Sequence, residues 1–357
     1  MKKEHREKRR KQRARRRDVL LKSMLAVMRP LPEIKKFEGP LNKIAILAQE
    51  KLGDAILLTP LFRELKKLAP RVEIHVICLG LNAAFFENDP HVDRVYSVKT
   101  DYPAYFRAIR PQSFDVLFNT KDHPSFNFLL HTRLIQARYR VGIQHPMHGG
   151  FFNVMLDWPF HTPIVEKNCA ILSYLFPGCR VEDYRPYLPP QPVREAIREA
   201  GSALRERNGL LVNLSAGEAE REWPPEKWMA LLKKINRPVM VLAMPGRYGD
   251  KRLLEDALPN VVRTEPTQNI YEAGELIKNA RMIITPDTSL IHVASCYNIP
   301  VVGLYRADVE HLRRFGPYAV LAEQLISSTP YVRDIGVDEA YRAWQRLESA
   351  ISGREAG

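Results

Sequence analysis

The chain has 357 residues, of which 45% are hydrophobic and 27% are charged, which is typical of a globular protein and long for one hydrophobic core. Its four cysteines are scattered without a CxxC or Cys/His spacing, which excludes a disulfide framework and a zinc site of the usual spacing. Eleven Lys or Arg and two Glu in residues 1–17 account for +9 of the net charge of +13, so the basicity is concentrated in an N-terminal arm.

The segment that follows this arm has apolar side chains at helical spacing, at Leu20, Leu21, Met24, Leu25 and Met28. It is too short for the about 20 residues that span a bilayer, and no A-x-A-type cleavage site follows it cleanly. Basic side chains beside a short amphipathic helix suit an anionic membrane surface. We therefore expect residues 1–29 to bind the inner face of the inner membrane, which makes the protein cytoplasmic and peripheral.

Two alternatives remain for the arm. It is a solvated tail whose helix packs on the body of the protein, or it is an arm that binds nucleic acid. Nucleic acid is the less favoured partner, because no aromatic side chains are interleaved with the basic ones.

Beyond Phe37, short apolar strands alternate with helices. Strands are predicted at 43–48, 72–78, 93–98 and 114–119, with an amphipathic helix at about 54–68. This alternation favours a parallel sheet covered by helices on both faces, which is a doubly wound α/β domain.

The segment 184–196, YRPYLPPQPVREA, contains four prolines and predicts a linker. The α/β pattern then resumes, with strands at 210–214, 238–243, 282–285 and 301–304, and helices at 225–235, 270–279, 289–297 and 337–352. The predicted division is an arm with its helix (1–36), an N-terminal α/β domain (37–188), a C-terminal α/β domain (189–336) and a final helix (337–357). Two such domains facing each other predict a cleft at the carboxyl ends of their strands.

A strand runs into a helix start in IITPDTSLIHVA, residues 283–294. Asp287 or Thr288 is suited to cap this helix, and the N–H groups of Thr288, Ser289 and Leu290 would then form an anion site fit for a diphosphate. His292 lies one turn further on nearly the same face. The alternative is an ordinary helix cap with a satisfied histidine.

A second strand end carries small and basic residues in LLVNLSAGEAEREWPPEKW, residues 210–228. Ser215 and Gly217 allow the backbone to approach a ligand, and Arg221 is suited to grip a phosphate with two hydrogen bonds. The alternative is a solvated arginine beside a packing tryptophan.

Asp54 follows the first predicted strand. It is either a carboxylate that stabilises the start of a helix or a general base that takes a proton from an attacking hydroxyl. A carboxylate at a helix start is a weak base unless a closed cleft removes water from it.

Several motifs of cofactor and metal sites are absent from the sequence. It has no GxGxxG after the first strand, no GxxxxGK[ST] and no Asp-x-Asp. We therefore expect no cofactor and no metal, and assign the stabilisation of a leaving nucleoside diphosphate to basic side chains and a helix N-terminus.

Taken together, these segments resemble the ADP-heptose:lipopolysaccharide heptosyltransferases, inverting glycosyltransferases of family 9 with the GT-B fold. The resemblance rests on four segments, which lie in this order between residues 42 and 306: LGDAILLTPLFRELKK, NDPHVDRVY, NLSAGEAEREWPPEKW and TPDTSLIHVASCYNIPVVGLY.

The resemblance implies roles for single residues. Asp54 matches the aspartate proposed to deprotonate the acceptor hydroxyl, and Arg221 stands where the family usually has a lysine that reaches the donor phosphates. Asp287 would hold hydroxyls of the donor sugar and the Thr288–Ser289 backbone its diphosphate, with His292 in the same region. The Ser215–Gly217 loop would lie against the donor.

The predicted function is therefore transfer of heptose from ADP-heptose to a lipopolysaccharide-core or lipid A–Kdo type acceptor. The alternatives are a transferase with another sugar nucleotide or a protein acceptor, and a non-catalytic protein of this fold that binds membrane or nucleic acid. Three departures from the family pattern bear on the donor: Ser289 in place of Gly, Arg221 in place of Lys, and no clear Glu in residues 243–250.

Overall fold

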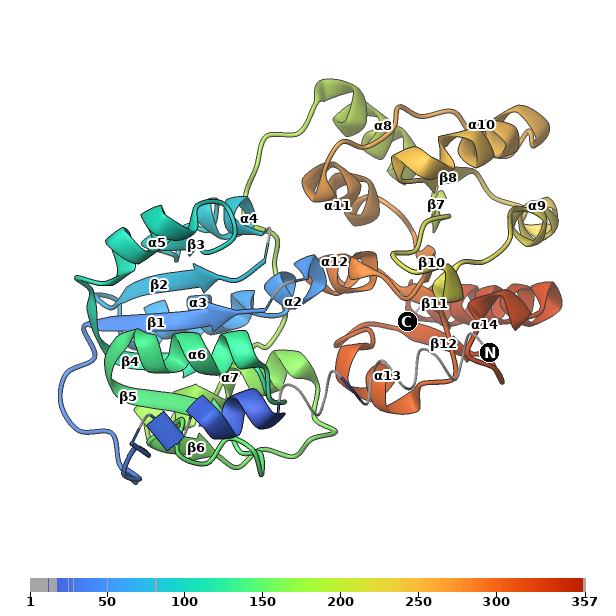
Figure 1. Ribbon diagram of the computed structural model, residues 1–357. Coiled ribbons are helices and arrows are strands. Elements are labelled where there is room, and N and C mark those ends of the chain that lie inside the picture. The colour runs from blue at the N-terminus through green and yellow to red at the C-terminus, as the bar shows by residue number, and fades with distance from the viewer. Residues whose placement is uncertain are drawn as a thin grey trace. The chain divides into compact units, whose positions relative to one another are not determined.

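The computed structural model describes residues 12, 18–24, 26–27, 29–49, 51–80 and 82–355. The chain divides into two compact units: unit 1 comprises residues 1–160 and 166–182, and unit 2 comprises residues 161–165 and 183–357. Residues 183–194 contain neither helix nor strand, and the predicted boundary between residues 188 and 189 falls within them. In the described residues, each unit has one six-stranded parallel sheet (Figure 1).

The sheet of unit 1 has the strand order β3-β2-β1-β4-β5-β6. Because the order reverses beside β1, successive right-handed crossovers place helices on opposite faces of the sheet. The strands are β1 (Lys43–Ala48), β2 (Glu73–Cys78), β3 (Arg94–Ser97), β4 (Ser113–Asn119), β5 (Gln136–Ile143) and β6 (Val154–Leu156). The helices are α2 (Leu52–Ile56), α3 (Thr59–Leu68), α4 (Ala83–Glu87), α5 (Tyr102–Ile109), α6 (Phe126–Leu134) and α7 (Ile164–Leu175).

The sheet of unit 2 repeats this topology, with the order β12-β11-β10-β7-β8-β9. Its strands are β7 (Leu210–Asn213), β8 (Val239–Leu242), β9 (Val261–Val262), β10 (Ile283–Pro286), β11 (Val301–Tyr305) and β12 (Ala322–Ile326). Its α-helices are α8 (Glu195–Glu206), α9 (Pro225–Lys234), α10 (Tyr248–Ala257), α11 (Ile270–Lys278), α12 (Ser289–Tyr297), α13 (Val309–Phe315) and α14 (Val337–Glu355). Three short 3-10 helices complete the described part of the unit: η1 (Ala219–Arg221), η2 (Pro245–Arg247) and η3 (Val332–Asp334).

The helix predicted at 54–68 is wrong in one respect, because the chain forms two helices there. α2 ends at Ile56 and α3 begins at Thr59. Pro60 has no N–H to donate to the carbonyl of Ile56, which would be its partner in a continuous helix. The Thr59 hydroxyl donates to that carbonyl instead, at 2.8 Å. The break therefore costs no hydrogen bond at this carbonyl, and it makes α2 a short, separate helix that carries Asp54.

Most other predicted elements lie within a few residues of their observed bounds. β1 and α12 match the predicted ranges, while α14 extends to Glu355, three residues beyond the prediction. α14 packs against α9, β11 and β12, so the predicted final helix is part of unit 2.

The apolar segment after the basic arm packs partly on unit 1. Residues 18–24, 26 and 27 are helical, and Leu21 is buried in a cluster with Leu129, Phe151 and Phe152. Val19, Leu20 and Val27 are exposed. Leu25, Met28 and all of residues 1–17 except Gln12 lie outside the described residues. In the part of the chain that is described, no helix has the length and apolar character needed to cross a bilayer.

We predict that Thr59→Val destabilises unit 1 by about 1–3 kcal/mol, because it leaves the buried Ile56 carbonyl without this donor while keeping the shape of the side chain. Thermal unfolding followed by circular dichroism measures the loss. Thr59→Ser, which keeps the hydroxyl, is the control. A valine variant as stable as the serine variant would show that the hydroxyl does not support the helix break.

Candidate functional site

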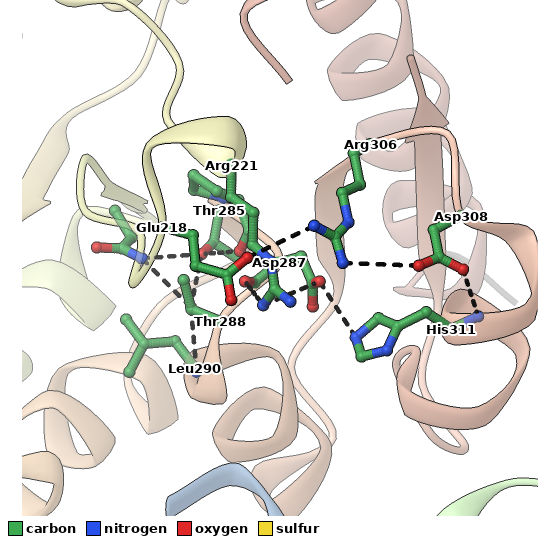
Figure 2. Close-up of polar contacts among 11 residues, drawn as sticks. Glu218, Arg221, Thr285, Asp287, Thr288, Leu290, Arg306, Asp308 and His311 are labelled. Atoms are coloured by element: carbon green, nitrogen blue, oxygen red, sulfur yellow. Dashed lines mark hydrogen bonds and ion pairs between the residues drawn. The ribbon is translucent and has the colours of Figure 1, made fainter. Parts of the chain in front are cut away.

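Three neighbouring strands of unit 2 end in charged residues that meet at one edge of the sheet. β11, β10 and β7 are adjacent, and their carboxyl ends lead to Arg306, Asp287 and the loop that carries Arg221. Figure 2 shows Arg221 and His311 directed at Asp287 from opposite sides. The reversal of strand order falls between β7 and β10, which is where open α/β sheets bind ligands.

Asp287 is the centre of this arrangement. Its side chain is only 8% exposed. Arg221 Nη1 lies 3.3 Å from its carboxylate and also donates to its main-chain carbonyl at 3.2 Å. His311 Nε2, on α13, lies 3.3 Å from the same carboxylate oxygen. Burial raises the pKa of Asp287, but the hydrogen bond to His311 and the charge of Arg221 together hold that pKa below its usual value. Asp287 is therefore an ionised carboxylate at neutral pH.

Arg221 is positioned by the tryptophan that follows it. The ring of Trp223 is fully buried, packs edge-on against Trp228 at 4.8 Å, and donates from Nε1 to the carbonyl of Ile335. Pro225 opens α9 directly afterwards. Because the loop is anchored two residues away, the guanidinium of Arg221 is held at the strand ends, with its side chain only 13% exposed. Trp223 therefore packs in the interior, as the alternative expected. Arg221, however, is paired with Asp287 and is not a solvated side chain.

Asn213 ties the ends of β7 and β10 together. Its Nδ2 donates to the carbonyl of Ser215 and to Thr285 Oγ1, each at 3.0 Å, and its Oδ1 accepts from the N–H of Ser215. Nδ2 also lies 3.4 Å from Thr288 Oγ1. This buried amide thus links the two predicted motifs through their side chains and backbone. Asn213 was not predicted as a site residue, although a polar residue at the end of a buried strand is a signal that the sequence contains.

The start of α12 is capped by Thr288, whose Oγ1 accepts from the N–H of Leu290 at 3.3 Å. The expectation that the Leu290 N–H is open to a ligand is therefore wrong, because that group already has a partner inside the protein. Ser289 and Thr288 are both half-buried.

His292 lies in the interior one turn along α12. Its side chain is buried, and burial lowers its pKa to about 4. Within the described residues, Nδ1 makes no hydrogen bond. His292 is therefore a buried, neutral imidazole.

The Ser215–Gly217 loop has one fixed end and one open end. Ser215 is buried, and its Oγ accepts from the N–H of Met244 at 2.7 Å, which joins this loop to the loop after β8. Gly217 is exposed. In the described structure, apart from its chain neighbours, no atom lies within 4 Å of the position that a Cβ would occupy there. The backbone at Gly217 is thus accessible to a ligand.

Asp54 belongs to unit 1 and is half-buried in the first turn of α2. Lys51 occupies the N-cap position of that helix, so Asp54 does not cap it. Two buried charged residues that were not predicted lie at the neighbouring strand end: Asp122 follows β4, and Lys167 reaches it from α7. Lys167 Nζ donates to the carbonyl of Thr120 at 2.6 Å and lies 3.8 Å from Asp122.

Among the described residues, no three His, Cys, Asp or Glu side chains are grouped so that they could hold a metal ion.

Comparison with known proteins identifies the family of the chain. Residues 103–341 match the family model described as glycosyltransferase family 9 (heptosyltransferase). The chain belongs to this family. It is therefore a glycosyltransferase, as the sequence motifs predicted. The matched residues include all of the unit 2 site, while Asp54 lies outside them.

Curated relatives and solved structures agree with this assignment. The chain is 22% identical over 276 residues to lipopolysaccharide heptosyltransferase 3 of Escherichia coli, covering 71% of this chain and 81% of that protein. It is 28% identical over 293 residues to lipooligosaccharide heptosyltransferase 2 of Haemophilus influenzae, covering 73% and 82%. A family 9 glycosyltransferase of Veillonella parvula superimposes with a TM-score of 0.66 at 16% identity, covering 86% of this chain and 97% of that one.

The structure of E. coli heptosyltransferase WaaC with ADP superimposes with a TM-score of 0.64 at 14% identity, covering 86% of this chain and 98% of that one. These likenesses show that the two six-stranded parallel sheets form the α/β fold of the GT-B heptosyltransferases.

The depressed pKa of His292 predicts an acid sensitivity of unit 2. An unfolded histidine has a pKa near 6.5 and binds a proton below that value, whereas buried His292 remains neutral down to about pH 4. The free energy of unfolding should therefore fall as pH drops from 6.5 to 4, and His292→Gln should remove about 2 kcal/mol of the fall between pH 7 and pH 5. Urea unfolding followed by tryptophan fluorescence measures the free energy of unfolding at each pH, since three of the four tryptophans lie in unit 2.

The exposed His161→Gln, in the same unit, is the matched control. If His292→Gln and His161→Gln lose stability equally between pH 7 and pH 5, His292 is not buried as a neutral group.

Proposed function

We propose that this family 9 enzyme transfers heptose from ADP-heptose to a sugar hydroxyl of a lipopolysaccharide inner-core acceptor, with inversion at the anomeric carbon. The observation that carries the proposal is the Arg221–Asp287 pair at the ends of β7 and β10, beside the capped start of α12. Support comes from the relatives, which are lipopolysaccharide and lipooligosaccharide heptosyltransferases, and from a neighbouring structure that holds ADP.

Unit 2 supplies the donor groups in this proposal. Arg221 neutralises the diphosphate by charge-assisted hydrogen bonds, and the N–H groups of Thr288 and Ser289 add to it at the positive end of α12. The ionised carboxylate of Asp287 accepts hydrogen bonds from hydroxyls of the sugar. The open backbone at Gly217 allows the donor to approach closely.

Asp54 of unit 1 supplies the base. Its carboxylate takes the proton of the acceptor hydroxyl as that oxygen bonds to the anomeric carbon of the heptose. The bond from that carbon to the β-phosphate oxygen breaks, and the electron pair leaves with ADP. Positive groups at the diphosphate stabilise the developing charge, so the proposed step needs no metal.

The decisive experiment follows ADP release from ADP-heptose and a core-truncated lipopolysaccharide. Asp54→Asn is expected to lower kcat by about 10²–10⁴ with little change in ADP-heptose affinity, because the amide cannot take the proton. Arg221→Gln is expected to weaken ADP-heptose binding by about tenfold or more, because it removes charge-assisted hydrogen bonds to the diphosphate.

The exposed Glu33→Gln, also in unit 1, is the matched control for Asp54. Turnover that is unchanged in Asp54→Asn would remove Asp54 from the chemical step. If ADP-heptose does not bind, it is not the donor. If ADP-heptose binds but is not turned over with the lipopolysaccharide, a protein acceptor is the next to test.

We also propose that the basic arm docks the enzyme on anionic lipid at the cytoplasmic face of the inner membrane. The +9 of residues 1–17 supports this, as do the exposed apolar side chains of Val19, Leu20 and Val27 beside the arm. Leu21 and Met24 pack against unit 1, whereas Val19, Leu20 and Val27 are available to contact lipid.

Co-sedimentation with phosphatidylcholine vesicles, with and without phosphatidylglycerol, tests the arm. Replacing the seven arginines of residues 1–17 by glutamine should abolish binding to the anionic vesicles, since each basic residue contributes about 1 kcal/mol there. Neutral vesicles are the control. Binding to anionic vesicles that survives the replacement would contradict the docking role.

A further inference from the structure

A carboxylate of the protein lies between two arginines at the proposed donor site. Glu218 Oε2 is 3.6 Å from Arg221 Nε and 3.5 Å from Arg306 Nη1. Figure 2 shows Glu218 reaching toward both guanidinium groups. Since both arginines contact the same oxygen, one anionic group at this point is within reach of both.

The contacts of Glu218 are weak compared with those of Asp287. Both distances are at or beyond the limit of a hydrogen bond, and the Glu218 side chain is 45% exposed. Arg221 Nε makes no hydrogen bond within the described residues although it is buried. Arg221 thus has a donor that its present partners do not satisfy, directed at the place where Glu218 lies.

Arg306 is held at the edge of the site by its own strand and helix. It is the first residue after β11, and its Nη2 lies 3.6 Å from Asp308, the residue that caps α13. Its side chain is 30% exposed. Arg306 is therefore accessible to a ligand, and a second charge is available beside Arg221.

Glu218 lies in the exposed part of its loop. Glu218 precedes η1 in extended conformation, next to the exposed Gly217, whereas the anchor of the loop is Trp223. A diphosphate offers several oxygens in geometries that match two guanidinium groups, and a single carboxylate oxygen at 3.5 Å does not compete well with it.

We propose that Glu218 is an exchangeable counter-anion that occupies the place of the donor diphosphate, and that Arg306 joins Arg221 as a second phosphate-binding residue. On binding, the diphosphate displaces the carboxylate of Glu218, which moves into solvent with the loop around Gly217. This inference rests on the proposed function for its donor, and it assigns Arg306 and Glu218 to the phosphate end of that donor.

Isothermal titration with ADP, inorganic pyrophosphate and adenosine tests the inference on the whole protein. Glu218→Gln should bind ADP and pyrophosphate about two- to fivefold more tightly, because the competing charge is gone. Arg306→Gln should bind both about tenfold or more weakly, because charge-assisted hydrogen bonds are lost. Adenosine, which has no phosphate, should bind all variants equally.

Glu310→Gln and Arg313→Gln, exposed on α13, are the matched charge controls and should leave ADP affinity unchanged. If ADP binding depends on Arg221 but not on Glu218 or Arg306, this inference is overturned while the proposed donor stands. If pyrophosphate shows the expected pattern but ADP does not bind, the roles of Glu218 and Arg306 at the phosphate stand and the proposed donor nucleotide is wrong. Weaker binding in Glu218→Gln would show that Glu218 contacts the donor instead of competing with it.

Discussion

The unit 2 site depends on one buried carboxylate. Asp287 stays ionised inside the protein, and a buried charge is tolerated only where partners repay its desolvation. Arg221 and His311 are those partners; Arg221 comes from the segment after β7, and His311 comes from α13, which follows β11. Removing one of the partners of a buried charge costs about 3–5 kcal/mol. Asp287 therefore does more than offer a ligand contact, because its charge holds the ends of three neighbouring strands in one arrangement.

The sheet order explains why these groups can meet at all. In each unit the order reverses beside the first strand, so the loops after β1 and β4, and those after β7 and β10, turn away to opposite faces. In each unit, no crossover connection covers the space between these two loops. Polar groups meet at these strand ends in both units: Asn213 Nδ2 lies 3.4 Å from Thr288 Oγ1 in unit 2, and Lys167 Nζ donates to the carbonyl of Thr120 in unit 1. The same topology thus prepares a polar site twice in one chain.

The sequence predicts the parts of this site that depend on local pattern. Thr288 before an apolar helix and Arg221 before Trp-Pro-Pro are readable, because caps and prolines act over a few residues. His311 and Arg306 are not, because their role arises only when β11 pairs beside β10. The helix break before Thr59 was readable in principle from Pro60, but the hydroxyl that compensates for it is a three-dimensional detail. β12, an edge strand with mixed burial, had no alternation strong enough to be predicted.

Arginine at position 221 is consistent with the rest of the cluster. Its Nη1 reaches Asp287 while its Nε faces Glu218, so one planar side chain serves a buried carboxylate and an exposed one at the same time. A lysine at this position has a single nitrogen and would have to choose between them. With Asp287 engaging the inner side of the guanidinium, the outer side is left for an exchangeable anion. Arg306 approaches that outer side from β11, where Glu218 already holds both arginines loosely. Arg221, Glu218 and Arg306 therefore form one set, in which a buried ion pair fixes the arginine and a weak one occupies the side that we propose for phosphate.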